Sequence, residues 1–144
     1  MAIVTLKLSG TKDITSKYDS AKDTPEATVF SIRALDSRIM GQINDAATSF
    51  ASPDPSRIDP RGATILNVHE ANFKTAQFGL AGWRNVRDAD GNDVPFKTVK
   101  RVVLGAEYDV IDPELLKTLP SMVIDEIGLA VKQYNTVTEA DVKN

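Results

Sequence analysis

The sequence predicts an α+β domain in which three or four helices pack on a small, mainly antiparallel sheet. The main observation is a change in apolar spacing. Residues 2–8 alternate between two sides, whereas after Asp36 the apolar residues recur every three or four positions. The spacing changes in the same way at Asp112. Because 144 residues with 42% hydrophobic content can bury a core of their own, we expect one domain over residues 1–144.

Two strands separated by a polar segment are predicted at the start of the chain. Residues 2–8 and 28–35 have the composition and the period of half-buried strands. Residues 11–27 between them are rich in Lys, Asp, Ser and Thr, and Tyr18 is their only aromatic residue. This composition predicts a polar arm, whose deletion would disrupt assembly without unfolding the helices.

The first helix is predicted over residues 37–50. Asp36 precedes it as an N-cap, because a short side-chain oxygen can accept hydrogen bonds from the free N–H groups of a first turn. Residues 52–62 follow and contain three prolines, which predicts a loop.

A second helix is predicted where an apolar stripe runs from Leu66 to Trp83, with Thr64 as its cap. Gly79 and Gly82 fall in its last turn. Glycine there either ends a helix or allows another part of the chain to approach closely.

The second half of the chain is predicted to begin with a turn at residues 88–93, followed by two short strands within residues 97–111. Asp112 and the proline after it are typical of a helix start, and a short helix is predicted to residue 118. The last helix is predicted to open at Pro120 and to end at Asn135. Residues 136–144 are polar and are expected to fray.

The charge pattern excludes some partners and suggests others. A formal net charge of −3 is atypical of a sequence-specific nucleic-acid binder, and no apolar stretch is long enough for a membrane span. Residues 61–101 carry a local charge of +3 and residues 107–144 one of −5. The two segments could attract each other within a monomer or between neighbours, and ordinary solvated faces are the alternative.

Residues that could carry catalysis are few. The chain has no cysteine, and its single histidine, His69, lies on the apolar stripe, where a partly buried helix residue is expected. The segment that starts at Asp88 resembles a calcium loop at its first ligand positions. Its sixth position, which requires glycine, is Asp93, and its twelfth, which requires glutamate, is Val99. We therefore predict no enzyme activity, no cofactor and no metal.

Three segments together resemble a known family. Residues 78–96 read Phe-Gly-Leu-Ala-Gly-Trp-Arg-Asn-Val-Arg-Asp-Ala-Asp-Gly-Asn-Asp-Val-Pro-Phe, and residues 29–35 read Val-Phe-Ser-Ile-Arg-Ala-Leu. The third segment has Leu119-Pro120 and apolar residues through Ile127, and it closes with Thr138-Glu139 and Asn144. Their order resembles small morphogenesis proteins of tailed bacteriophages, grouped with the tail assembly chaperones.

The resemblance implies a small protein without catalytic activity that holds tail or tape-measure subunits before they polymerise. Its partners would be other phage tail or neck proteins, in the cytoplasm of the host cell during assembly. The strand at residues 2–8 and the arm at residues 11–27 depart from this family. They suit the alternative, a structural virion component such as a neck, connector or tail-completion ring protein, which could form a homo-oligomer.

Six residues are predicted to take part in protein binding. Trp83 is either a core residue or an interface anchor, and the core interpretation is favoured because an indole buries a large apolar area. The binding surface would then combine the polar arm with basic side chains. The complete set is Tyr18, Trp83, Arg84, Arg87, Lys97 and Lys100.

Overall fold

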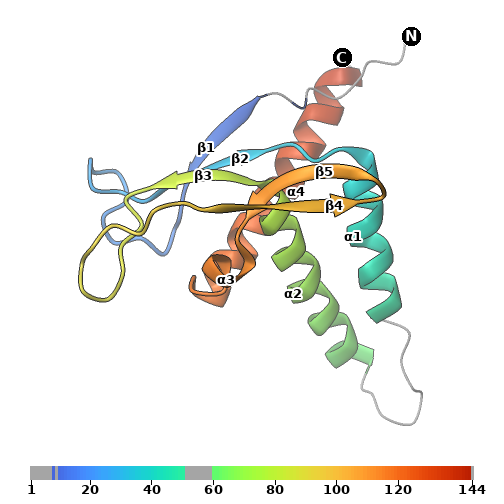
Figure 1. Cartoon of the computed structure of the whole chain (residues 1–144), viewed down its shortest axis with the longest axis horizontal. Helices are drawn as coiled ribbons and strands as arrows, with labels where there is room; N and C mark the ends of the chain where they lie inside the picture. Colours follow the sequence, from blue (N-terminus) through green and yellow to red (C-terminus); the bar gives the residue numbers. More distant parts are fainter. Residues whose placement is uncertain (1–7, 9, 51–59, 144) are drawn as a thin grey trace.

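A computed structural model describes residues 8, 10–50 and 60–143 of the chain (Figure 1). The predicted α+β class is confirmed, since within these residues four helices accompany antiparallel sheets of three and two strands. The predicted strand at residues 2–8 lies outside the described residues except for Leu8, and so do residues 52–59 of the predicted loop. The elements are β1 (Thr11–Thr15), β2 (Val29–Arg33), α1 (Ser37–Phe50), α2 (Pro60–Gly79), β3 (Leu80–Arg84), β4 (Thr98–Val103), β5 (Ala106–Ile111), α3 (Pro113–Leu116) and α4 (Ser121–Lys143).

The three-stranded sheet has the order β1-β2-β3, with β2 in the centre. The central strand was predicted, and it buries Phe30 and Ile32 on the core side. The prediction of a polar arm is wrong for its first part, because residues 11–15 form β1. This strand pairs with β2, beginning with Thr11 opposite Arg33. β1 is an edge strand that needs only Ile14 to pack on the core, so its composition stays polar. Deleting residues 11–27 would remove this strand.

The predicted C-terminal end of the second helix is wrong, because the strand β3 occupies its last residues. The helix ends at Gly79, and the next residue, Leu80, already pairs with Ile32 of β2. Apolar residues at positions 80 and 83 fit a helical stripe and also a strand with an irregular register, and the pairing with β2 decides between them. At its other end α2 begins at Pro60, so the predicted cap, Thr64, lies inside the helix.

The hairpin of β4 and β5 confirms the two short strands predicted around Gly105. Leu104 and Gly105 both have positive φ, of 51° and 81°, which is the backbone of a two-residue type I′ turn. The hairpin forms a sheet of its own and does not join β2, contrary to the single sheet that the sequence suggested.

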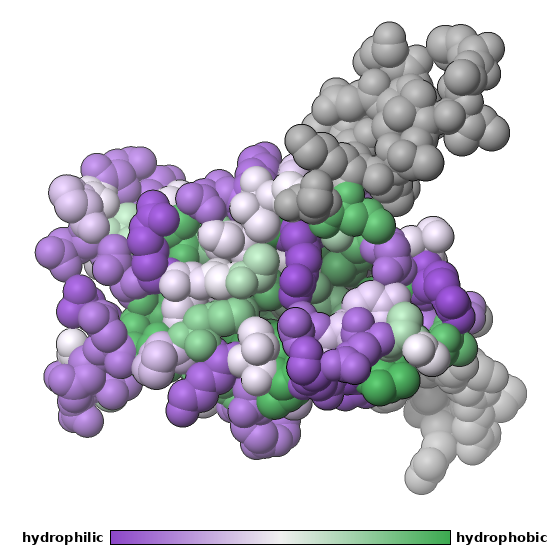
Figure 2. Space-filling view, turned by 45° about the horizontal axis from the view of Figure 1, so that its top comes forward, coloured by the Kyte–Doolittle hydropathy of each residue, from purple (hydrophilic) through white to green (hydrophobic). Residues whose placement is uncertain are grey.

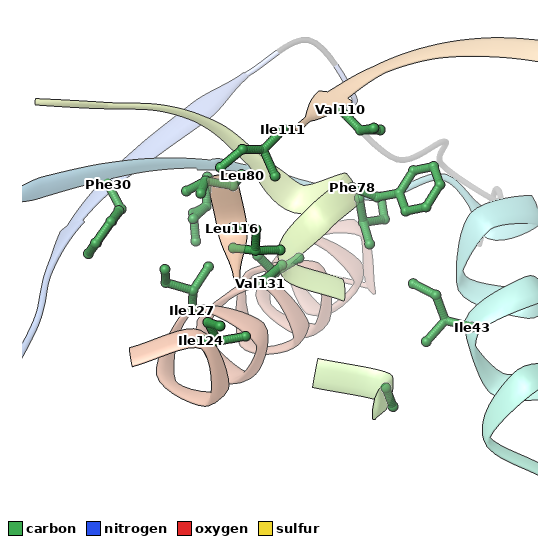
Figure 3. Close-up of a cluster of buried hydrophobic side chains, with 14 of the residues drawn as sticks. Phe30, Ile43, Phe78, Leu80, Val110, Ile111, Leu116, Ile124, Ile127 and Val131 are labelled. Atoms are coloured by element: carbon green, nitrogen blue, oxygen red, sulfur yellow. The ribbon is translucent and has the colours of Figure 1, made fainter. Parts of the chain in front are cut away.

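The core lies between the sheets and the helices α1, α2 and α4 (Figure 3). Ile39 and Ile43 come from α1, Leu80 from β3, and Ile127 and Val131 from α4, and all five are nearly inaccessible. Glycines allow α2 and α4 to lie close together. A Cβ added to Gly79 would lie 2.6 Å from the side chain of Val131, and one added to Gly128 would lie 2.7 Å from the backbone oxygen of Asn72.

The starts of α1 and α3 agree with the sequence analysis, whereas the ends of α3 and α4 do not. Asp36 accepts a hydrogen bond from the N–H of Ile39 at 2.9 Å, and Asp112 accepts one from the N–H of Glu114 at 3.0 Å. The short helix α3 ends at Leu116, two residues before the predicted end. The last helix does not stop at Asn135 and does not fray after residue 136, since α4 continues to Lys143.

The side chain of Asn135 explains why this residue is not a helix cap. Its Oδ1 accepts from the backbone N–H of Leu35 at 2.9 Å, and its Nδ2 donates to the backbone oxygen of Leu35 at 3.0 Å. Both residues are buried. The side-chain amide therefore pairs with both backbone groups of Leu35, as the backbone of a neighbouring strand would, and it connects α4 to the junction of β2 and α1.

Replacing Asn135 by alanine is expected to lower the free energy of unfolding by about 2–3 kcal/mol, because two buried backbone groups lose their partners. Urea denaturation followed by circular dichroism measures the change. Thr136→Ala is the matched control on the exposed side of the same turn, and it should change stability by less than about 0.5 kcal/mol. Equal effects of the two substitutions would contradict the role of Asn135 as a tie.

Arg33, the arginine of the segment at residues 29–35, has a structural role. Its Nε donates to the backbone oxygen of Phe78 at 3.0 Å, at the end of α2, and its Nη2 donates to the backbone oxygen of Asp109 at 2.7 Å, on β5. Burial lowers the pKa of Arg33, and the nearby charge of Asp109 opposes this shift. One guanidinium thus connects the central strand, the end of a helix and the second sheet.

Candidate functional site

The structure distributes the six predicted binding residues over three places. Tyr18 lies in the loop between β1 and β2, Trp83 and Arg84 lie on β3 with Arg87 just after it, and Lys97 and Lys100 lie at the β4–β5 hairpin. Tyr18 and Arg87 line one hollow together.

Trp83 is half-buried and belongs to the fold. Its ring meets Phe30 and Phe96 edge-on, with centroid separations of 6.3 and 5.3 Å, and its Nε1 donates to the backbone oxygen of Val94 at 2.8 Å. The turn at residues 88–93 is confirmed, with Gly91 at a φ of 82°. The tryptophan and this turn form one structural unit.

The predicted basic residues mostly have partners within the chain. Arg84 lies 3.7 Å from Asp13, and Arg87 lies 3.4 Å from Glu26 and 3.6 Å from Asp93. The Nζ of Lys100 lies 2.9 Å from Asp109 and 3.2 Å from Glu107, and the hydrogen bonds that it donates to Asp109 and Glu107 raise the pKa of the lysine. At this point, the basic middle and the acidic C-terminal part of the chain attract each other within the monomer.

The loop at residues 16–28 is organised by its own hydrogen bonds. Asp19 accepts from the N–H of Ala21 at 2.9 Å through Oδ1 and from the N–H of Thr28 at 2.8 Å through Oδ2. Ser16 is buried, and its hydroxyl oxygen accepts from the N–H of Tyr18 at 3.1 Å. These bonds give the loop a defined shape, unlike that expected of a free arm.

The same loop is attached to α4. The backbone N–H of Lys17 donates to Oε2 of Glu126 at 3.1 Å. The Nζ of Lys17 lies 5.1 Å from the centroid of the Tyr18 ring, within the range of a cation–π contact. Tyr18 is thus held beside the helix.

Two hollows meet at Tyr18 and Met122, and we call them together the Tyr18 groove. One has a volume of about 370 Å³ and the other about 350 Å³. The first is lined by Ser16, Tyr18, Asp19, Thr28, Phe30, Val86, Arg87, Leu119, Pro120, Met122 and Val123. The second is lined by Lys17, Tyr18, Met122, Asp125, Glu126, Leu129, Ala130 and Gln133.

Three large apolar side chains of the groove are exposed. Tyr18 is 49% exposed, Met122 52% and Leu129 50%. Met122 and Leu129 are seven residues apart, which is about two turns of α4, so they lie on one side of the helix. On the face of the molecule that Figure 2 shows, small hydrophobic patches lie between hydrophilic residues.

Most charged side chains around the groove have polar partners within the chain. Arg87 has two carboxylate partners, and the carboxylate of Glu126 accepts a hydrogen bond from the backbone N–H of Lys17. Asp125 lies 2.8 Å from His69 and accepts from Asn72 at 3.3 Å. What remains available is apolar contact area, which suits protein binding better than acid–base chemistry.

His69 departs from the sequence prediction, because its side chain is 55% exposed where a partly buried residue was expected. Its Nδ1 faces Asp125 of α4. Among the residues that the structure describes, no group of three or more histidine or carboxylate side chains could hold a metal ion. No helix in the same ranges is long and apolar enough to cross a membrane.

A further hollow of about 280 Å³ lies between α1, β2 and β5. Its polar groups serve the fold: Arg33 binds two backbone oxygens, and the hydroxyl of Tyr108 donates to Oδ2 of Asp36 at 2.9 Å. Partial burial and the hydrogen bond to Asp36 raise the pKa of Tyr108. This hollow is the weaker candidate for a functional site.

The sequence analysis missed Met122 and Leu129. Both lie off the apolar stripe by which α4 was recognised, and this was the signal that could have found them. Large apolar residues outside the buried stripe of a helix need another partner or remain exposed.

Comparison with protein-family models, curated proteins and solved structures finds no match to this chain.

Proposed function

We propose that this chain is a non-enzymatic morphogenesis protein of a tailed bacteriophage, which binds a tail or tape-measure subunit during assembly. The Tyr18 groove is the surface that holds the subunit. The observation that carries the proposal is the meeting of two hollows at Tyr18 and Met122, with three exposed apolar side chains along them. Aromatic residues and methionine are enriched at protein interfaces, whereas lysine and glutamate are depleted there.

The order of the loop supports binding by a preformed surface. Asp19 and the attachment of Lys17 to Glu126 hold Tyr18 in place before any partner arrives. Less conformational entropy is lost when such a surface binds. This property suits a protein that must hold and later release subunits.

The resemblance to tail assembly proteins gives the class of partner. In this chain, the side chains of the segment at residues 78–96 that carry the resemblance mainly stabilise the fold. Asn85 has a φ of 59° and donates to the backbone oxygen of Ala27 at 2.9 Å, and Trp83 packs on Phe96. The segment therefore stabilises the sheet next to the groove, and the groove makes the contact.

A structural virion component remains the second candidate, and the exposed hairpin of β4 and β5 favours it. Val102 at 68% and Leu104 at 57% are among the most exposed large apolar side chains of the described residues. A ring or connector subunit needs such surfaces to contact its neighbours.

Co-expression with the tail-tube and tape-measure subunits of the same phage tests the proposal. We expect the chain to co-purify with one of them and to be absent from purified virions by mass spectrometry. Stoichiometric presence in virions would favour the structural candidate. Failure to bind either subunit, together with absence from virions, would contradict both.

A further inference from the structure

The hairpin strand β4 has one edge that no other strand of the described residues covers. Asp112 donates from its N–H to the backbone oxygen of Lys97 at 2.9 Å, and the two-residue turn closes between Val103 and Ala106. In an antiparallel pair, hydrogen-bonded and non-hydrogen-bonded residues alternate. The register therefore directs the backbone groups of Thr98, Lys100 and Val102 away from β5.

The other edge of the hairpin differs. The backbone oxygen of Asp109 on β5 accepts from Arg33, and β5 packs against α2 and β3. On β4 every residue from Thr98 to Val102 is exposed. Within the described ranges, no backbone group outside β5 bonds to these three outward-facing residues of β4.

A small hollow lies beside this edge, on the face that β4 turns toward α1 and α2. It has a volume of about 100 Å³ and is lined by Ile39, Gln42, Ile43, Lys74, Phe78, Arg101 and Val103. Its floor is apolar and its rim carries two cations, Lys74 and Arg101. In contrast to Lys100, neither of these cations has an ion pair within 4.0 Å among the described residues.

The charge of β4 disfavours pairing with a second copy of itself. Lys100 and Arg101 are adjacent at the middle of the strand, and Lys97 precedes it. Antiparallel pairing of two such strands would bring like charges opposite each other, which destabilises a sheet. An acidic segment has the complementary charge.

We propose that the free edge of β4 binds an extended acidic segment of a partner protein by strand addition. The added strand bonds to the backbone of Thr98, Lys100 and Val102. On its face toward the helices, an acidic residue lies by Arg101, and an apolar residue two positions away lies by Val103, over the hollow. This surface is distinct from the Tyr18 groove, and neither proposal depends on the other.

The probe is a fluorescent eight-residue peptide of the sequence Glu-Thr-Val-Thr-Glu-Thr-Val-Thr, which carries glutamate and valine two positions apart on one face. A peptide with lysine in place of each glutamate is its control. Fluorescence anisotropy should show that the acidic peptide binds at least about tenfold more tightly than the basic one. Hydrogen exchange should slow at the amides of Thr98, Lys100 and Val102, the three that face outward.

Val102→Pro removes an outward-facing N–H and leaves the bonds between β4 and β5 in place. It should weaken binding of the acidic peptide at least about tenfold, whereas Val102→Thr, which keeps the N–H and a β-branched side chain, should stay within about twofold. Arg101→Glu should remove the preference for the acidic peptide, and Lys22→Glu, which makes the same change of charge in the loop at residues 16–28, should not.

Several results would overturn the proposal. These are equal binding of the two peptides, no binding of either, unchanged affinity of Val102→Pro, or exchange that slows at residues other than these three. Tyr18→Ala should bind the peptide like the parent chain, so a failure of this proposal is distinguishable from a failure of the Tyr18 groove.

Discussion

Trp83→Ala is expected to lower the free energy of unfolding by about 3–5 kcal/mol, as large-to-small substitutions of core aromatic residues do. The indole connects three parts of the chain: Phe30 on β2, Phe96 after the turn, and the backbone of Val94, to which Nε1 donates at 2.8 Å. Its removal leaves a cavity and an unpaired carbonyl. Far-UV circular dichroism in urea measures the loss, because Trp83 is the only tryptophan and its fluorescence disappears with it.

Trp83→Phe is the matched control. It keeps an aromatic ring near Phe30 and Phe96 and loses the hydrogen bond to Val94, so we expect a smaller loss, of about 1–2 kcal/mol. If Trp83→Ala left stability unchanged and weakened subunit binding, the residue would be an interface anchor.

Gly128→Ala is expected to destabilise the protein by about 2 kcal/mol. A Cβ at this position would lie 2.7 Å from the backbone oxygen and 2.9 Å from Cα of Asn72. A rotamer change cannot relieve a contact with backbone, so α2 and α4 must separate and lose packing between them. The intrinsic preference of alanine for helices, about 1 kcal/mol over glycine, offsets only part of this cost.

Gly41→Ala is the matched control, and it is expected to raise the free energy of unfolding in the same experiment. Gly41 lies on the exposed side of α1, and nothing stands within 4 Å of the position that a Cβ would take. This substitution should therefore raise stability by up to about 1 kcal/mol. A stabilising effect at both glycines would contradict the close crossing of α2 and α4.

The elements that could be predicted had two agreeing local signals. The helix α1 has an N-cap at Asp36 and an amphipathic spacing behind it, and its predicted bounds, residues 37–50, match the structure. The edge strand β1 has polar side chains on both faces, so it lacks the alternation that marks a half-buried strand. Its existence depends on pairing with β2, which the local sequence does not show.

The candidate site was only partly predictable for a related reason. Tyr18 was found because it is a lone aromatic residue in a polar segment. The basic residues were chosen by charge, but sequence could not reveal that Arg87 pairs with Glu26 and Asp93 or that Lys100 pairs with Asp109. Charge is visible in a sequence, whereas its neutralisation by distant residues depends on the fold.

Affinity for the tail or tape-measure subunit that co-purifies with the chain tests the central claim most directly. The measurement compares the parent chain with Tyr18→Ala and Leu129→Ser by isothermal titration calorimetry. Val68→Ser is the control, because Val68 is 46% exposed on α2 and does not line the groove. We expect each groove variant to lose about 2 kcal/mol of binding energy, about thirtyfold in Kd, with an unchanged unfolding midpoint and with Val68→Ser at parental affinity. Parental affinity in both groove variants would contradict the account.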